Sequence, residues 1–408
     1  MGGGYALIGE KLGHSFSPAI HGKLGDYPYR LEELSPEELE SFLTAGAFDG
    51  LNVTIPYKKA VLPFCAELTP QAQRIGSVNT ILRRLDGTLL GHNTDYDGFL
   101  YLLRSANAEV EGKKVLVLGT GGASLTVKTV LEDLGAGEIV FISRSGPDNY
   151  TNLHRHSDAH IIVNTTPVGM YPNTGVSPVD LELFPALEGV FDLIYNPART
   201  QLLLDAERRG LTCANGLGML VAQAKAAAER FLGEEIPDSR VDEIAREMER
   251  DTRNLLLVGM PGCGKTTVGR GLARRLGRKL VDTDAMVEER AGRPIPQIFE
   301  EEGEEAFRRL EHEALKSVSA QSGLIIATGG GIITRPENMD LLRQNSTVIF
   351  LRRPPEELPV KGRPLSQREG VEALYRHRLP LYEAAAHWTV DNIGIEATVE
   401  AIIRRLEA

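Results

Sequence analysis

Short apolar runs alternate with amphipathic helical patterns along the whole 408-residue chain. This alternation is typical of α/β architecture, in which helices cover a sheet of buried strands. Two apolar runs, at 113–119 and 254–258, lead into a glycine-rich turn and then a helical pattern. Between them, the charged stretch 236–251 carries few residues able to fill a core, and we expect it to end a helix that begins near Leu217. The main domain boundary is therefore predicted near residue 250.

Composition and charge narrow the class of protein. The chain has 42% hydrophobic and 25% charged residues, as ordinary globular proteins do. Its formal net charge of -11 argues against a general nucleic-acid binder, which would need a basic face. No apolar run reaches the roughly 18 residues that cross a bilayer, and the first residues lack a signal-peptide pattern. Three widely spaced cysteines favour neither a disulfide framework nor a metal cluster. We expect a cytoplasmic protein that binds neither nucleic acid nor membranes.

A segment that starts at Gly259 has the spacing Gly-x-x-x-x-Gly-Lys-Thr, between an apolar strand and a helical pattern. That is the context which a phosphate-binding P-loop requires. Its glycines let backbone N–H groups turn toward phosphates, Lys265 supplies a positive charge, and the Thr266 hydroxyl can reach Mg²⁺. The sequence therefore predicts that this part of the chain binds ATP and transfers its terminal phosphoryl group. The residues predicted to bind the nucleotide are Gly262, Gly264, Lys265, Thr266 and Thr267.

Polar residues downstream of the P-loop provide a place for a phosphoryl acceptor. Asp282 and Asp284 follow the predicted second strand, where two carboxylates can hold hydrated Mg²⁺ and orient a hydroxyl. Alternatively, Asp284 caps the helix that follows. An arginine near Glu311 on a helix could simply belong to the solvent-exposed face of that helix. Glycine triplets at strand ends, in contrast, usually let a ligand approach the backbone. The further features are Arg308 in a helical pattern, glycines at 329–331, a Pro- and Gly-rich stretch at 361–365 able to act as a lid, and an Arg-Leu-Pro-Leu-Tyr segment at 378–382 that begins or ends a helix.

Together these motifs resemble shikimate kinase, over residues from about 253 to 408. The resemblance implies that Asp284 orients the shikimate hydroxyls, while Asp282 and Thr266 serve Mg²⁺. These residue types suit the reaction, because phosphoryl transfer is mostly positioning and charge neutralisation, and a guanidinium binds a carboxylate bidentately. The other roles that the resemblance implies are a carboxylate clamp by Arg308 and Arg378, a backbone contact at Gly330, and a lid arginine, Arg363, that closes on the transferring phosphate.

The first half of the chain carries four short polar motifs. Ser15 and Ser17 precede a helical pattern, and we interpret Ser17 as the helix cap, although two hydroxyls beside a helix N-terminus also make a carboxylate site. A short strand broken by proline follows, with Lys58 just past the break, whereas the neighbouring Lys59 is interpreted as a surface lysine. Polar residues also follow two later apolar runs, at 76–80 and 91–95.

In this order and spacing the four motifs resemble shikimate dehydrogenase, and the match extends over residues 1 to about 240. It implies that Lys58 and Asp95 are the proton-transfer pair at the carbonyl being reduced. Asp95 favours the protonated form of Lys58 and desolvation opposes it, so the sequence leaves open whether Lys58 donates the proton or mainly binds. The implied substrate contacts are Ser15, Ser17 and Thr54 at the carboxylate and neighbouring oxygens, Asn79 at a ring hydroxyl, and Gln223.

A dinucleotide-binding unit is predicted after residue 113. The turn Gly119–Ser124 opens a helix, as a pyrophosphate-binding turn should, with serine in place of the third glycine. Arg144 after the second strand suits the 2′-phosphate of NADP. Only about twenty residues separate Ser143 from Asn164, so we expect the helix after that strand to be missing or abbreviated. The predicted NADP contacts are Gly119, Gly121, Gly122, Ala123, Ser143 and Arg144, and the resemblance adds Met219 beside the nicotinamide.

We interpret the chain as a bifunctional enzyme that reduces 3-dehydroshikimate to shikimate with NADPH and phosphorylates shikimate with MgATP. The predicted fold is an α/β substrate domain at 1–97, completed by a helix around 216–248, a Rossmann-like NADP domain at 98–215, and a P-loop kinase domain with a parallel sheet at 252–408. The expected partners are small-molecule substrates, and no oligomeric state is predicted. Two alternatives are a kinase with a degenerate dehydrogenase half that only binds or regulates, and a nucleotide or sugar kinase on the same P-loop fold.

Overall fold

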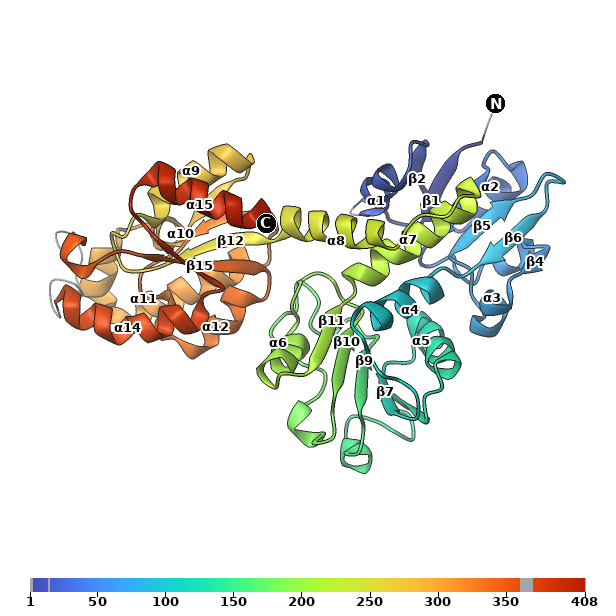
Figure 1. Cartoon of the computed structure of the whole chain (residues 1–408), viewed down its shortest axis with the longest axis horizontal. Coiled ribbons are helices and arrows are strands. Elements are labelled where there is room, and N and C mark those ends of the chain that lie inside the picture. The colour runs from blue at the N-terminus through green and yellow to red at the C-terminus, as the bar shows by residue number, and fades with distance from the viewer. Residues whose placement is uncertain (1–2, 14, 360–369, 408) are drawn as a thin grey trace. The chain divides into compact units, whose positions relative to one another are not determined.

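The computed structural model describes residues 3–13, 15–359 and 370–407, so Arg363 lies outside the described residues. The chain divides into two compact units (Figure 1). The first unit comprises Met1–Gly169, Ser177–Tyr195 and Asp205–Glu247, and the second comprises Met170–Val176, Asn196–Leu204 and Met248–Ala408. Within the described ranges, every helix is too short or too polar to cross a membrane.

The first unit begins with a mixed six-stranded sheet in the order β2-β1-β3-β5-β6-β4. Strand β1 pairs in parallel with β2 and β3, whereas β5 pairs in antiparallel fashion with β3 and β6. The strands are β1 (Tyr5–Gly9), β2 (Tyr29–Glu33), β3 (Gly50–Val53), β4 (Glu67–Leu68), β5 (Thr80–Arg83) and β6 (Leu89–His92), and the helices are α1 (Ser17–Leu24), α2 (Leu39–Ala45) and α3 (Pro70–Ile75).

A second, fully parallel sheet of the same unit has the order β11-β10-β9-β7-β8. Strand β7, which lies between β9 and the edge strand β8, buries four consecutive apolar residues, 115–118, as expected of a parallel strand covered on both faces. Because the chain passes from β7 to β8 on one side and then to β9 on the other, the carboxyl ends of β7 and β9 border a switch point, where open α/β sheets bind ligands. The elements are β7 (Lys114–Leu118), β8 (Glu138–Ile142), β9 (Ile161–Asn164), β10 (Gly189–Asp192), β11 (Thr212–Asn215) and α5 (Gly122–Asp133). Helix α6 (Gln201–Arg208) begins in a segment of the second unit and ends in a segment of the first.

The connection between β8 and β9 is short, as the sequence predicted. Its regular structure is confined to the 3-10 helix Leu153–His156, so the expectation of an abbreviated helix is confirmed. The Asp148 carboxylate lies 2.9 Å from Nε2 of the buried His156 and 3.3 Å from Arg155, and these contacts close the shortened loop.

Helix α4 (Asp95–Ser105) joins the two sheets of the first unit, and α7 (Leu217–Leu232) packs along it. The prediction of one helix running from near Leu217 through the charged stretch is wrong. Gly233 follows α7 with a φ of 69°, a left-handed conformation that ends a helix, and a separate helix α8 (Ser239–Thr252) begins after it.

The second unit holds a fully parallel sheet in the order β13-β14-β12-β15-β16. Its central strand β12 is buried at every residue, which confirms the predicted strand at 254–258 and the α/β class. The elements are β12 (Asn254–Val258), β13 (Leu280–Asp282), β14 (Ile325–Ala327), β15 (Ser346–Arg352), β16 (Trp388–Asp391), α9 (Lys265–Leu276), α10 (Thr283–Ala291), α11 (Ile295–Ser319), α12 (Pro336–Arg343), α14 (Val371–Ala385) and α15 (Ile395–Glu407).

Candidate active sites

A pocket of about 420 Å³ in the first unit gathers residues from distant parts of the sequence. Its walls include the predicted substrate contacts Ser15, Ser17, Thr54, Lys58 and Gln223. They come from the approach to α1, the end of β3 and the middle of α7, so the fold brings three separate segments to one cavity.

Ser17 does not cap helix α1 in the way that the sequence suggested. The helix begins at Ser17 itself, and Phe16 occupies the N-cap position without a side-chain hydrogen bond. The Ser15 hydroxyl oxygen accepts from the Ser17 N–H at 3.2 Å and so takes over part of the capping.

Lys58 and Asp95 form an ion pair at the wall of this pocket. Lys58 Nζ donates to Asp95 Oδ2 at 2.6 Å, and Asn79 Nδ2 donates to Asp95 Oδ1 at 3.0 Å. The Asn79 amide oxygen in turn accepts from the Thr94 N–H at 2.7 Å. Asp95 and Asn79 are buried behind the wall, while Lys58 and Thr94 reach the cavity. Asp95 is the first residue of α4, where the helix N-terminus favours a carboxylate.

Two aromatic residues that were given no role in the sequence analysis also line the cavity. The Phe16 and Tyr195 rings meet edge to face, with centroids 6.0 Å apart; Phe16 is the N-cap of α1, and Tyr195 lies in the loop after β10. His21 lines the same cavity, and burial lowers its pKa to about 3, which keeps it neutral. A tyrosine after a buried strand was visible in the sequence, but only its position across the cavity from Phe16 marks it as a pocket residue.

The glycine-rich turn after β7 fits a pyrophosphate. Gly119 has a φ of 99°, and a Cβ there would lie 2.8 Å from the Thr166 side chain, so the turn requires glycine. Helix α5 begins at Gly122 with Gly121 as its cap, and a Cβ at either position would meet nothing within 4 Å. Open space at a helix N-terminus, followed by Ala123, suits an anion.

The other predicted NADP contacts lie in two places. Ser143 and Arg144 follow β8, where the Ser143 hydroxyl oxygen accepts from the Gly146 N–H at 2.8 Å and Arg144 is exposed. Met219 lies in the first turn of α7 and is buried.

The P-loop has the backbone that its sequence predicts. Gly262 and Gly264 have φ angles of 82° and 100°, and helix α9 begins directly at Lys265. Lys265 is buried, and its Nζ donates to the carbonyl oxygens of Gly259 and Met260 at 2.8 and 3.0 Å. Thr267 follows in the first turn of α9, and it lines a cavity next to the P-loop together with Lys265 and Thr266.

Asp282, rather than Asp284, caps helix α10. Its Oδ1 accepts from the Asp284 N–H at 3.0 Å, while its Oδ2 accepts from the Thr266 hydroxyl at 2.7 Å. The described residues contain no group of three or more His, Cys, Asp or Glu side chains that could hold a metal. Mg²⁺ at a nucleotide needs only one or two protein oxygens beside the phosphates, so Thr266 and Asp282 fit it.

A cavity of about 630 Å³ next to the P-loop contains the predicted acceptor residues. Arg308 and Glu311 are both buried in its wall, and Arg308 Nη1 donates to Glu311 Oε2 at 2.7 Å. The interpretation of this pair as a solvated face is therefore wrong. Glu311 is a site residue that the sequence analysis missed, because a glutamate three residues after an arginine on a helix looks the same on a wet surface.

Arg378 reaches the glycine triplet from within α14. Its Nη1 donates to the Gly330 carbonyl oxygen at 3.3 Å, and the Tyr382 hydroxyl donates to the same oxygen. The helix continues through Pro380, so the expectation that this segment begins or ends a helix is wrong.

Two carboxyl groups of the cavity, those of Asp284 and Glu311, lie in an environment that disfavours their charged forms. The pKa of Asp284 is raised to about 6, first by burial and then by the neighbouring Glu311, with Lys265 opposing the rise. Asp284 Oδ1 and Glu311 Oε1 have no hydrogen-bond partner in the described part of the chain. A Cβ at Gly329 would lie 2.6 and 2.4 Å from these two oxygens, so both point at the glycine triplet.

The fold and the two pockets define a protein with an oxidoreductase-type dinucleotide-binding unit and a P-loop phosphotransferase unit. Residues 7–81 match the family model of the shikimate dehydrogenase substrate binding domain, and residues 261–407 match that of shikimate kinase. A shikimate dehydrogenase (NADP(+)) from Clostridium perfringens is 37% identical over 267 residues, which cover 60% of this chain and 98% of that protein. The chain belongs to the shikimate dehydrogenase family, and it carries a shikimate kinase domain after the dehydrogenase.

Solved structures agree with this assignment of the first part. A chorismate mutase/shikimate 5-dehydrogenase fusion protein from Clostridium acetobutylicum is 39% identical with a TM-score of 0.57, covering 60% of this chain and 96% of that one. The shikimate 5-dehydrogenase of Thermus thermophilus in complex with NADP(H) and shikimate is 34% identical with a TM-score of 0.54, covering 60% of this chain and 98% of that one.

Proposed function

We propose that this chain reduces 3-dehydroshikimate to shikimate with NADPH at one site and phosphorylates shikimate with MgATP at the other. The observation that carries the proposal is that each unit has its own pocket, with the charged groups that its reaction needs at the wall. Both pockets fall in the range of a few hundred Å³ that is usual for small-molecule sites.

In the dehydrogenase pocket, hydroxyl groups bind the substrate, and an ammonium group donates to the oxygen of the carbonyl that is reduced. Ser15, Ser17 and Thr54 hold the carboxylate and neighbouring oxygens. NADPH, when bound, supplies the hydride that is added to the carbonyl carbon. Lys58, held by Asp95 at 2.6 Å, places an N–H at the carbonyl oxygen, where the proton is needed. The remaining contacts are Gln223 to the substrate, and Asn79, which acts at a ring hydroxyl and also fixes Asp95.

The NADP contacts follow the carboxyl ends of the neighbouring parallel strands β7 and β8, and one more lies at the start of α7. The turn at Gly119, Gly121, Gly122 and Ala123 binds the pyrophosphate, because the space beside Gly121 and Gly122 at the start of α5 is open. Ser143 and Arg144 bind the 2′-phosphate, and Met219 lies beside the nicotinamide.

In the kinase unit, the loop residues Gly262, Gly264, Lys265, Thr266 and Thr267 bind ATP. Thr266 and Asp282 would hold Mg²⁺, which would neutralise negative charge on the phosphates of ATP. Lys265, now directed at its own loop carbonyls, is long and flexible enough to turn its ammonium toward the phosphates.

The acceptor half of the kinase cavity binds shikimate. Arg308 and Arg378 clamp the carboxylate, and the glycine at position 330 gives a backbone contact. Asp284 Oδ1 accepts the hydrogen bond of the attacking hydroxyl and orients it for in-line transfer. Arg363, the proposed lid arginine, lies outside the described residues.

Kinase turnover is expected to fall at acid pH, because Asp284 must be ionised to accept this hydrogen bond. Its pKa is raised to about 6, so the carboxyl is protonated at lower pH. At saturating MgATP, kcat/KM for shikimate should fall about tenfold per pH unit below that value and level off above it. The dehydrogenase rate of the same samples checks that the protein stays folded. A profile that is flat down to pH 5 would show that Asp284 is not the titrating group.

Two assays separate this proposal from its alternatives. Oxidation of NADPH with 3-dehydroshikimate tests the first site, and release of ADP that depends on shikimate tests the second. Zero dehydrogenase turnover in well-folded protein would favour a half that only binds or regulates, whereas ADP release with sugars or nucleotides in place of shikimate would favour another kinase.

The domain limits and location belong to the same proposal. We place the substrate domain at 1–97 with its completing helices at 216–248, the NADP domain at 98–215 and the kinase at 252–408. The absence of a spanning helix in the described ranges supports the cytoplasm as its location.

A further inference from the structure

Helices α4 and α7 of the dehydrogenase approach each other closely at Gly98. A Cβ at Gly98 would lie 2.6 Å from the Met219 carbonyl oxygen and 3.1 Å from Gln223 Cβ. Because the nearest of these atoms belongs to the backbone, any larger residue would push the two helices apart. Helix α4 begins at Asp95, so this close packing also fixes how Gln223, at the pocket wall, lies relative to Asp95 behind it.

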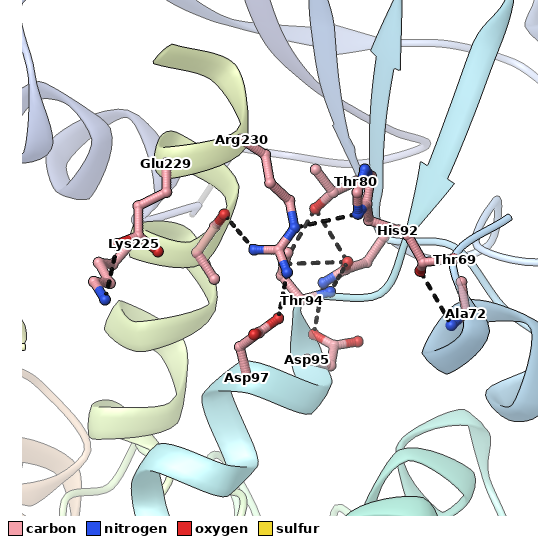
Figure 2. Close-up of polar contacts among 12 residues, drawn as sticks. Thr69, Ala72, Thr80, His92, Thr94, Asp95, Asp97, Lys225, Glu229 and Arg230 are labelled. Atoms are coloured by element: carbon pink, nitrogen blue, oxygen red, sulfur yellow. Dashed lines mark hydrogen bonds and ion pairs between the residues drawn. The ribbon is translucent and has the colours of Figure 1, made fainter. Parts of the chain in front are cut away.

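Arg230 joins the same two helices through Asp97, the residue next to Gly98. Figure 2 shows its guanidinium reaching from α7 to Asp97 on α4 and to His92 on β6. Arg230 Nη2 lies 3.2 Å from Asp97 Oδ2, and Nε donates to His92 Nδ1 at 3.2 Å. A third N–H donates to the Ala226 carbonyl of its own helix at 2.6 Å, which fixes the guanidinium plane.

The contact between Arg230 and His92 requires a neutral imidazole. Burial, together with the charges of Arg230 and Arg84, lowers the pKa of His92 to about 4, so the imidazole is neutral and Nδ1 can accept at neutral pH. The His92 carbonyl oxygen accepts from the Asn79 N–H at 3.1 Å, and Asn79 in turn holds Asp95. Arg230 is thereby linked to the Lys58–Asp95 pair in two ways. One link runs through Asp97, which is on helix α4 with Asp95. The other runs through His92 on β6 and then Asn79, which donates to Asp95.

We propose that Arg230 is a positioning residue of the dehydrogenase, which fixes α7 against α4 and β6 so that Gln223 faces the Lys58–Asp95 pair. Gln223 and Arg230 are seven residues apart on α7 and therefore lie on the same face of the helix. The inference rests on the proposed role of Gln223 at the substrate. An arginine suits this task because its rigid planar guanidinium directs separate N–H groups at the carboxylate and the imidazole, whereas a lysine is a single point charge on a flexible stem.

The test compares Arg230→Met with Arg230→Lys in the full chain. Arg230→Met should lower kcat/KM for 3-dehydroshikimate roughly 10- to 100-fold at 25 °C, because small displacements of positioning groups have effects of that size. Arg230→Lys should recover part of the loss through Asp97. Kinase turnover of the same chain should not change, nor should the dehydrogenase rate of the control Arg104→Met, an exposed arginine on α4.

A double-mutant cycle with Gln223→Ala separates positioning from simple stabilisation. If Arg230 acts through Gln223, Arg230→Met should cost much less in the Gln223→Ala background than in the wild type. Equal losses in both backgrounds, or an Arg230→Met enzyme with a lowered melting temperature but normal kcat/KM, would overturn the proposal. The wild-type protein is assayed alongside. If the wild type itself shows no dehydrogenase turnover, the proposed function is refuted, and the role of Arg230 is not what has failed.

Discussion

Replacing Lys58 with alanine is expected to lower the turnover of 3-dehydroshikimate by roughly 10²- to 10⁴-fold, the usual contribution of a positioned acid or base. The reason is that Lys58 lines the pocket and its ammonium is held there by Asp95, at 2.6 Å from Oδ2. Steady-state kinetics with NADPH should show the loss in kcat, with KM for 3-dehydroshikimate nearly unchanged.

Lys59→Ala is the matched control for this variant. Lys59 is the next residue in the chain, carries the same charge and is exposed, so its loss should leave both activities unchanged. A Lys58→Ala enzyme that loses affinity but keeps its kcat would assign Lys58 to binding and remove it from proton transfer. Kinase turnover on the same chain reports that the protein is folded.

Asp284→Asn is expected to lower kinase turnover by a similar factor, roughly 10²- to 10⁴-fold. The amide has the same shape but cannot carry the negative charge that orients the attacking hydroxyl, and it removes a carboxylate from beside Glu311. Shikimate-dependent ADP release measures the effect. Because a buried charge is removed, the unfolding temperature should not fall.

Asp251→Asn provides the control in the kinase unit. Asp251 is an exposed aspartate at the end of α8, and its nearest cation, Arg250, lies 3.7 Å away. The same change of chemistry there should leave ADP release as it is in the wild type. If Asp284→Asn kept wild-type turnover, the hydroxyl would have to be oriented by another group of the cavity.

The parts of the fold that sequence predicted well are those where one local rule dominates. A buried strand, a glycine-rich loop and a helix at 254–276 follow from phosphate-loop geometry, because only glycine adopts the positive φ of Gly262 and Gly264 without cost. The shortened connection after β8 could also be predicted, since chain length alone excludes a full helix there.

The errors occurred where neighbours in space decide between two local possibilities. Pro380 suggested a helix end, yet α14 continues through it and presents Arg378 to Gly330. Glu311 resembled a surface partner of Arg308 until packing placed both inside the cavity.

The spacing of residues along the sequence could not predict which distant side chains the fold brings into one site. Tyr195 lies about 180 residues after Phe16, and only the sheet topology brings their rings together. The link from Arg230 to Asp97 and His92 likewise joins a helix, a second helix and a strand that have no common motif.

The most direct test of the account is a single reaction in which the purified chain receives 3-dehydroshikimate, NADPH and MgATP. We predict that shikimate 3-phosphate forms only when all three are present, and that shikimate accumulates when MgATP is left out. The account would be contradicted if the protein phosphorylates added shikimate but neither oxidises NADPH nor forms any shikimate from 3-dehydroshikimate.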